Sequence, residues 1–223
     1  MLKTIVRSPI TTIVLFLAAA ALLVVGGVGA AQAAPQLTGG DYTAKVKLDS
    51  LEISIVENGT DLKSESAAND TALLGKRFLD ANGIDESNPF EIGKIYDESL
   101  AVSNSGAIDE YVRVTVLKYW TDKDGNKMTN PEYAKYIELT WGDKWSIDEN
   151  VSTAERTVLY YPEKVAPGEP TDAFVTNIKI SEEVKNAKNG NFHGATFHVD
   201  VTANAVQTHN GTEAMTGVWG RTV

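Results

Sequence analysis

Apolar and polar residues alternate with a period of two along most of the chain, which is typical of strands with one buried face. The first such stretch has an apolar face made of Tyr42, Ala44, Val46 and Leu48. The phase then shifts by one residue at Asp49-Ser50, and a second apolar face continues through Leu51, Ile53 and Ile55. Because a one-residue shift turns every side chain to the opposite face, we expect a bulge or a break between two strands there.

The stretch from Tyr111 to Trp120 has almost no polar face. One side carries Val112, Val114 and Val116, and the other carries Tyr111, Arg113, Thr115, Leu117 and Tyr119. This pattern predicts a central strand with apolar side chains to bury on both faces. We expect the second face to be covered by a helical insertion or by another molecule.

The remaining strands indicate the fold class. They are predicted at 95–102, 136–141, 156–161 and 173–180, and the last long strand runs from Ala195 to Val206. Roughly eight strands separated by turn signals are typical of two packed antiparallel layers. The sequence therefore predicts an all-β fold, an antiparallel β-sandwich of the jelly-roll or immunoglobulin-like type.

Short helical insertions interrupt this strand pattern. Residues 61–89 are rich in Ser, Ala, Asn and Asp, and they contain a predicted short helix that ends before Gly83. Asn130 and Pro131 have the order expected of a helix cap and first helical residue, and Ser181 begins another predicted turn.

The first 33 residues are typical of a signal peptide. Lys3 and Arg7 precede an apolar run, and the small residues Ala31-Gln32-Ala33 fit a cleavage site. We expect cleavage before Ala34. A retained membrane anchor is the alternative, because the apolar run would be long enough to span a bilayer if it were left uncut.

Cleavage divides the chain into three predicted parts. The signal peptide covers 1–33, an N-terminal segment covers 34–50, and the β-sandwich domain covers 51–223 with its insertion at about 61–89. Pro35, Gly39 and Gly40 make the start of the N-terminal segment flexible in this interpretation.

Charge and cysteine content limit the possible partners and the compartment. The full chain has a net charge of −10, and removal of Lys3 and Arg7 leaves 18 basic against 30 acidic residues, a net charge of −12. Such a chain repels nucleic acid and anionic lipid, so we expect neither as a partner. The chain contains no Cys. Because small extracellular eukaryotic domains often carry disulfides, an exported chain without Cys indicates a bacterial cell surface.

Two groups of residues suggest metal chemistry, but each has a simpler interpretation. His198 and Asp200 lie on one face of the last strand, yet a zinc site needs three or four ligands and we find no third. Asp122, Asp124 and Asn126 alternate as at the start of a calcium loop, although a hairpin turn is the favoured interpretation. We therefore predict no enzyme activity, no catalytic or metal-binding residue and no cofactor, and calcium binding at 122–126 stays open.

Aromatic residues provide candidates for a contact surface. Trp120 and Tyr160 are expected in the core. Trp141 and Trp145 flank a Gly-Asp-Lys sequence that reads as a loop, so we predict that they are exposed. Exposed aromatic side chains can stack on sugars or anchor a protein partner.

Several stretches together resemble the TasA/camelysin group of exported proteins of Gram-positive bacteria. "DSLEISIVENGT" is similar to the first mature motif of that group, and "YDESLAVSNSGAIDEYVRVTV" is similar to its strand, Asn-x-Gly turn and long strand. "LYYPEKVAPGEPTDAFVTNIKI" and "FHVDVTANAVQTHN" are similar to the sandwich end of related proteins. The chain departs from the group at Asp49-Ser50 and Ile92-Gly93, and it carries its own insertion around 71–82.

The resemblance implies a secreted jelly-roll subunit of extracellular biofilm matrix fibres. Subunits of this group join when the N-terminal segment of one copy adds a strand to the sheet of the next, and the partner is another copy or a related matrix subunit. The donor candidates here are Tyr42, Ala44, Val46 and Leu48, and Val112, Val114 and Val116 are the acceptor core candidates. Pairing of residues 42–48 within their own domain remains open. The alternative function is a monomeric cell-surface module that binds glycan or protein.

Overall fold

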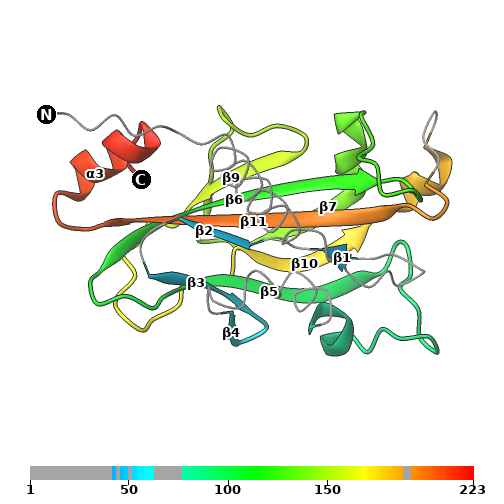
Figure 1. Cartoon of the computed structure of the whole chain (residues 1–223), viewed down its shortest axis with the longest axis horizontal. Coiled ribbons are helices and arrows are strands. Elements are labelled where there is room, and N and C mark those ends of the chain that lie inside the picture. Colours follow the sequence, from blue (N-terminus) through cyan, green and yellow to red (C-terminus); the bar gives the residue numbers. More distant parts are fainter. Residues whose placement is uncertain (1–41, 44–45, 50–51, 63–76, 188–191) are drawn as a thin grey trace, which may run out of the picture. The chain divides into compact units, whose positions relative to one another are not determined.

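A computed structural model describes residues 42–43, 46–49, 52–62, 77–187 and 192–223. The predicted signal peptide, the predicted cleavage site, Ala44 and the start of the predicted helix near Gly83 lie outside these residues. Strands dominate the described part of the chain, and they form two sheets (Figure 1). None of the helices in this part has both the length and the apolar stretch that a membrane crossing requires.

The first sheet has six strands in the order β1-β11-β6-β9-β8, with β2 also paired to β11. Its strands are β1 (Tyr42–Thr43), β2 (Val46–Asp49), β6 (Glu110–Thr121), β8 (Ser146–Ile147), β9 (Arg156–Tyr160) and β11 (Thr196–Gln207). The pairs of β6 with β11 and β9, and of β8 with β9, are antiparallel, whereas β1 and β2 run parallel to β11.

The second sheet has five strands in the order β4-β3-β5-β10-β7, and all of its pairs are antiparallel. Its strands are β3 (Ile53–Glu57), β4 (Thr60–Leu62), β5 (Ile95–Asn104), β7 (Ile137–Trp141) and β10 (Val175–Ile180). The β3–β4 hairpin turns at Asn58-Gly59, where both residues have positive φ. An Asn-Gly pair is suited to such a turn because both residues tolerate the left-handed conformation.

The two sheets enclose one apolar core. Strand β6 contributes Val112, Val114 and Val116, each fully buried, and β11 contributes its alternate residues from Phe197 to Ala205. The five-stranded sheet adds core residues from all five of its strands, among them Ile55, Leu100 and Ile178. This arrangement confirms the predicted all-β sandwich with short helical insertions, and it confirms Trp120 as a core residue.

The short helical turns follow the sequence signals where the structure describes them. The turn η1 (Pro131–Tyr136) begins after Asn130, whose side chain accepts a hydrogen bond from the Glu132 backbone N–H at 3.1 Å. The turn η2 (Glu182–Asn186) is capped in the same way by Ser181. Residues 77–81 are helical, and this turn places the fully buried Phe78 in the core.

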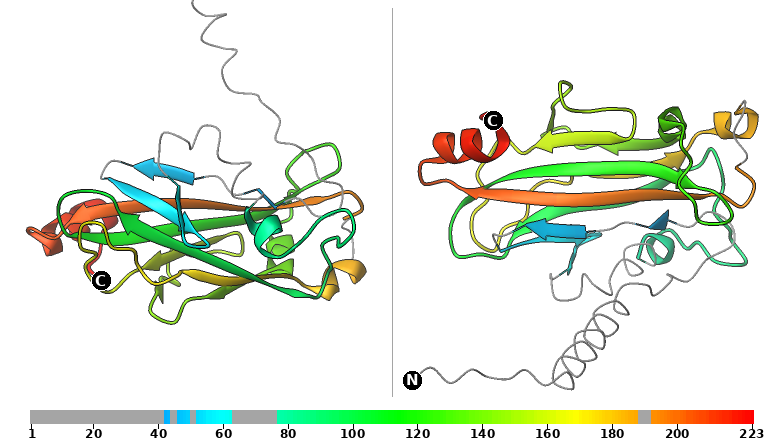
Figure 2. Two further views of the ribbon diagram at one scale, coloured as in Figure 1. Left: turned by 90° about the horizontal axis from the view of Figure 1, so that it is seen from below. Right: turned by 45° about the horizontal axis from the view of Figure 1, so that its top comes forward.

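A C-terminal helix, α3 (Gly211–Trp219), covers one end of the outer face of the six-stranded sheet (Figure 2). Its Met215 and Trp219 pack in a second apolar cluster with residues of β9 and β11, namely Val158, Tyr160 and Val206. The second apolar face of the Tyr111 strand is therefore partly covered from within the chain, because Tyr111 packs against this cluster. The cover comes from α3, whereas the helical turn at 77–81 fills the core between the sheets.

Candidate functional site

The N-terminal strands lie along the outer edge of β11 (Figure 1). Tyr42 pairs with Phe197, and Val46 pairs with Val201. Both pairs differ by 155 in residue number, so β1 and β2 keep a single register with β11 and behave as one interrupted strand. Leu48 continues this register beside Ala203.

β11 has neighbours on both edges, but the two neighbours differ in kind. On one side β6 pairs with it antiparallel along all twelve residues of each strand. On the other side, among the described residues, β11 pairs with the two-residue β1 and the four-residue β2, and both run parallel to it. Within the described residues β1 and β2 pair with no other strand, so they form the edge of the sheet.

The connection from the N-terminal strands to the rest of the sandwich is short. β2 ends at Asp49, and β3 begins at Ile53 in the opposite sheet. The predicted break between two strands at Asp49-Ser50 is confirmed, because the chain changes sheet there. Residues 50–52 therefore connect the edge strand in sequence to the body that follows it.

The structure places the predicted donor and acceptor residues on different strands of one sheet. Tyr42, Val46 and Leu48 occupy register positions beside β11, and Ala44 lies outside the described residues. The acceptor candidates lie in β6, which has β11 on one edge and β9 on the other. β6 therefore has no free edge along its centre, and the N-terminal strands pair with β11 of their own chain, which is the pairing within the domain that the sequence left open. The sequence signal for β11 was its long alternation, which does not indicate an edge.

Trp145 is buried, and its prediction as a surface aromatic residue is wrong. Its side chain is 6% exposed and packs against Tyr161 and Phe174, with ring centroids 5.1 and 5.6 Å away. Its indole N–H donates a hydrogen bond to the Asp172 carbonyl at 2.9 Å. A residue in a predicted loop can be buried in this way because an indole needs only one polar partner.

Trp141 is half-buried at the end of β7 and packs against the core. Strand β7 pairs only with β10 among the described strands, and Trp141 lies opposite Val175 in that pair. The neighbouring Gly142 approaches the Ala173 carbonyl so closely that a Cβ would lie 1.9 Å from the oxygen. Because Trp145 is buried and Trp141 is half-buried, the two tryptophans do not form the exposed pair that the sequence suggested.

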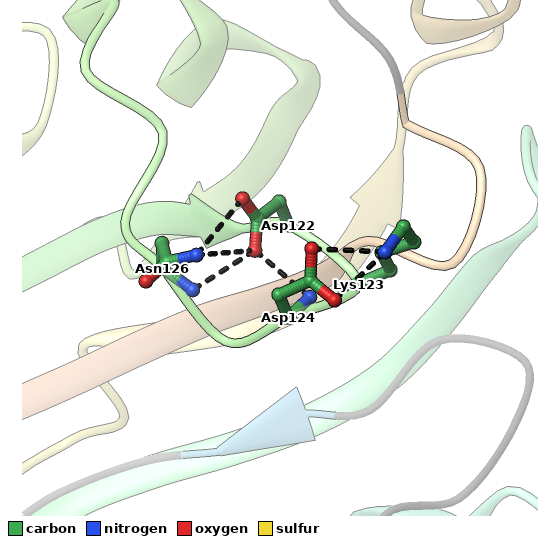
Figure 3. Close-up of polar contacts among 4 residues, drawn as sticks. All are labelled: Asp122, Lys123, Asp124 and Asn126. Carbon is green, nitrogen blue, oxygen red and sulfur yellow. Dashed lines mark hydrogen bonds and ion pairs between the residues drawn. The ribbon is translucent and has the colours of Figure 1, made fainter.

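The Asp122–Asn126 stretch is a hairpin turn whose polar groups bind one another (Figure 3). The Asp122 carboxylate accepts backbone N–H bonds from Asp124 and Asn126, both at 2.9 Å. These bonds, that from Asn126 first, lower the pKa of Asp122 below its ordinary value. Asp124 pairs with Lys123 at 2.7 Å. The side chains that suggested a calcium loop thus stabilise the turn itself.

His198 and Asp200 lie on the outer face of β11 and contact side chains of β6. The His198 ring stacks on Tyr119, with ring centroids 4.6 Å apart, and its Nε2 lies 2.8 Å from the Thr121 hydroxyl. The Tyr119 hydroxyl donates a hydrogen bond to Asp200 at 3.2 Å. Within the described residues, no group of three or more His, Cys, Asp or Glu side chains is placed to hold a metal ion.

Comparison with known proteins gives no relative: no family model, no curated protein and no solved structure matches the chain.

Proposed function

We propose that this protein is a secreted structural subunit of extracellular biofilm matrix fibres, in which each copy adds its N-terminal strand to the sheet of the next. The observation that carries this proposal is the single-register pairing of β1 and β2 with the edge of β11. The resemblance to the TasA/camelysin group supports it. The partner in this proposal is a second copy of the chain or a related matrix subunit.

Exchange of this strand between copies requires few changes. The same backbone hydrogen bonds form whether residues 42–49 come from the same chain or from another copy. Exchange demands that β1 and β2 leave the β11 of their own chain and that the chain opens between Asp49 and Ile53, and it leaves the antiparallel strands of both sheets in place. Exchange of an identical element between copies is a low-cost route to assembly.

The direction of such a contact favours a filament. The donated strand and the accepting edge of β11 are different surfaces of the molecule, so the contact is heterologous. A heterologous contact that does not close into a ring adds copies without limit. Backbone pairing at the edge supplies the affinity, and the side chains of the donated strand supply specificity.

The experiment that tests this proposal compares two deletions in the chain that begins at Ala34. Removal of 34–49 takes away both N-terminal strands, and we expect a folded monomer that forms no fibres by electron microscopy or sedimentation. Removal of 34–41 alone keeps both strands and is the matched control, which we expect to polymerise. Fibres formed by the longer deletion would contradict strand addition.

A further inference from the structure

Two glutamates lie side by side in the apolar core of the five-stranded sheet. Glu57 ends β3 on the face that also carries Ile53 and Ile55, and it pairs with Leu100 of β5. Glu98 lies two residues before Leu100 and therefore on the same face of the sheet. The exposed fractions of Glu57 and Glu98 are 0% and 2%. The core thus contains two carboxyl groups on adjacent strands.

Most of the oxygen atoms of this pair lack a hydrogen-bond donor. Neither oxygen of Glu57 has a partner among the described residues, and Oε2 of Glu98 has none. Oε1 of Glu98 accepts bonds from the Ser99 backbone N–H at 3.2 Å and from the Asn58 amide at 3.3 Å. A buried carboxylate without donors is strongly disfavoured, whereas a protonated carboxyl group carries no net charge.

In the part of the chain that the structure describes, one basic group faces Glu57. Nε of Arg77, in the helical turn at 77–81, lies 4.0 Å from Oε2 of Glu57. Among the described residues, Glu98 and Arg77 are the charged groups that act on Glu57. Burial first, and then the neighbouring Glu98 charge, raise the pKa of Glu57 to about 9 in spite of Arg77. Burial likewise raises the pKa of Glu98 to about 7.

We propose that Glu57 and Glu98 form a pH-sensitive lock that holds β3, β5 and the helical turn at 77–81 together while both carboxyl groups are protonated, and that loosens when they ionise. The lock is distinct from the strand-addition edge and does not depend on it. Arg77 offsets part of the charge of Glu57, and it does not act on Glu98, so ionisation of either carboxyl group loosens the packing. Phe78 follows Arg77 and packs in the core against Tyr96, with ring centroids 5.8 Å apart. Loosening of the lock would expose the Phe78 side chain.

A proton is a better occupant of this site than a metal ion. A divalent cation between the two carboxylates would be repelled by the Arg77 guanidinium, which lies close to Glu57. The described residues also provide no third acidic or histidine side chain to complete a ligand set. Protonation needs no third ligand and introduces no cation beside Arg77, because it removes the negative charge that burial disfavours.

The sign of the pH effect follows from the raised pKa values. A carboxyl group that is harder to ionise in the folded state binds more protons there than in the unfolded chain, so the folded state loses stability as pH rises. The contribution is fully present below the ordinary glutamate pKa of 4.5 and is lost as pH rises through about 7 for Glu98 and about 9 for Glu57. Each additional bound proton changes the folding equilibrium constant about tenfold per pH unit.

Urea unfolding at about pH 6 and about pH 8 tests the lock in the wild-type chain and in the double variant E57Q/E98Q. We expect the wild-type folding constant to fall at least about tenfold more than that of the variant over this interval. The control E163Q changes an exposed glutamate and should retain the wild-type dependence. Glu110, whose pKa burial also raises to about 7, remains in all three chains and cancels from the comparison. Equal pH dependence in the wild type and the double variant would overturn the proposal.

A second measurement works without any variant. The side-chain carboxyl carbon signals of Glu57 and Glu98 in the folded wild-type chain report their titration by NMR, and we expect both to titrate well above the ordinary glutamate range. Titration near the ordinary value would overturn the lock. A third measurement adds millimolar calcium at neutral pH to the wild-type chain and to E57Q/E98Q. If calcium stabilises the wild-type chain and not the variant, the glutamate pair binds a cation and the proton lock is wrong.

Discussion

If copies join by strand addition, a chain that lacks residues 34–49 is expected, at an equimolar ratio, to shorten the fibres of the chain that begins at Ala34 to small oligomers. The truncated chain keeps the edge of β11 and can accept a strand, but it has no β1 or β2 to donate. Each truncated copy that joins a fibre therefore ends it. The length distribution by electron microscopy, measured over a series of mixing ratios, checks this result.

The same mixing series contains its own control. A chain that lacks only 34–41 retains both strands and should join fibres without shortening them. Fibres of unchanged length in the presence of excess truncated chain would show that β11 does not receive the donated strand. This outcome would also separate strand addition from lateral association, which a truncated copy would not stop.

Replacement of Trp145 by Ala is expected to lower the free energy of unfolding by about 3–5 kcal/mol, as for other large aromatic residues removed from a core. The change removes the packing against Tyr161 and Phe174 and leaves the Asp172 carbonyl without its indole donor. Such a loss is a large share of the stability of a typical domain. Urea unfolding followed by circular dichroism measures it.

This substitution also tests the alternative function. The comparison is Trp141→Ala, at a half-buried position on the edge strand β7, where we expect a smaller loss of stability. If Trp145→Ala kept the wild-type stability and abolished binding to a glycan or a protein, the monomeric binding module would replace the fibre subunit as the better account.

Local pattern was sufficient to predict the sandwich. The alternation in β6 and β11 identifies their buried faces residue by residue, because side chains on a strand point to opposite sides in turn. Val112 and Val114 are fully buried, as their positions predict. The caps at Asn130 and Ser181 were predictable for the same reason, since a cap is a contact within a few residues.

Neighbour relations could not be predicted in this way. The alternation at 42–48 indicates a strand, but it contains no signal for which strand lies beside it or for a parallel direction. The apolar sequence of β6 therefore predicts β6 as the acceptor, whereas β11 is the strand that lies beside β1 and β2. The burial of Trp145 likewise depends on Tyr161 and Phe174, which are distant in the sequence.

The C-terminal helix had a signal that the strand analysis missed. Met215 and Trp219 are four residues apart and share a helix face, and Gly220 follows in the left-handed conformation that commonly ends a helix. The preceding strand alternates up to Val206, and the spacing then changes from a period of two to the helical spacing of Met215 and Trp219. The consequence was that cover for the outer face was expected from 61–89.

The most direct test of strand exchange is the variant V46C/V201C. The chain has no Cys, so the two introduced thiols are the ones available for disulfide formation, within one chain or between copies. Val46 and Val201 are partners in the register, and strands that pair lie about 4.8 Å apart, within reach of a disulfide. The single variant V46C is the control for random oxidation.

After assembly and oxidation, the account predicts a ladder of disulfide-linked multimers on a non-reducing gel. When labelled and unlabelled chains are mixed before assembly, mass spectrometry should find the 46–201 disulfide joining one of each. A disulfide found only within single chains, at every protein concentration, would contradict the account, because residues 42–49 would then remain with their own sheet.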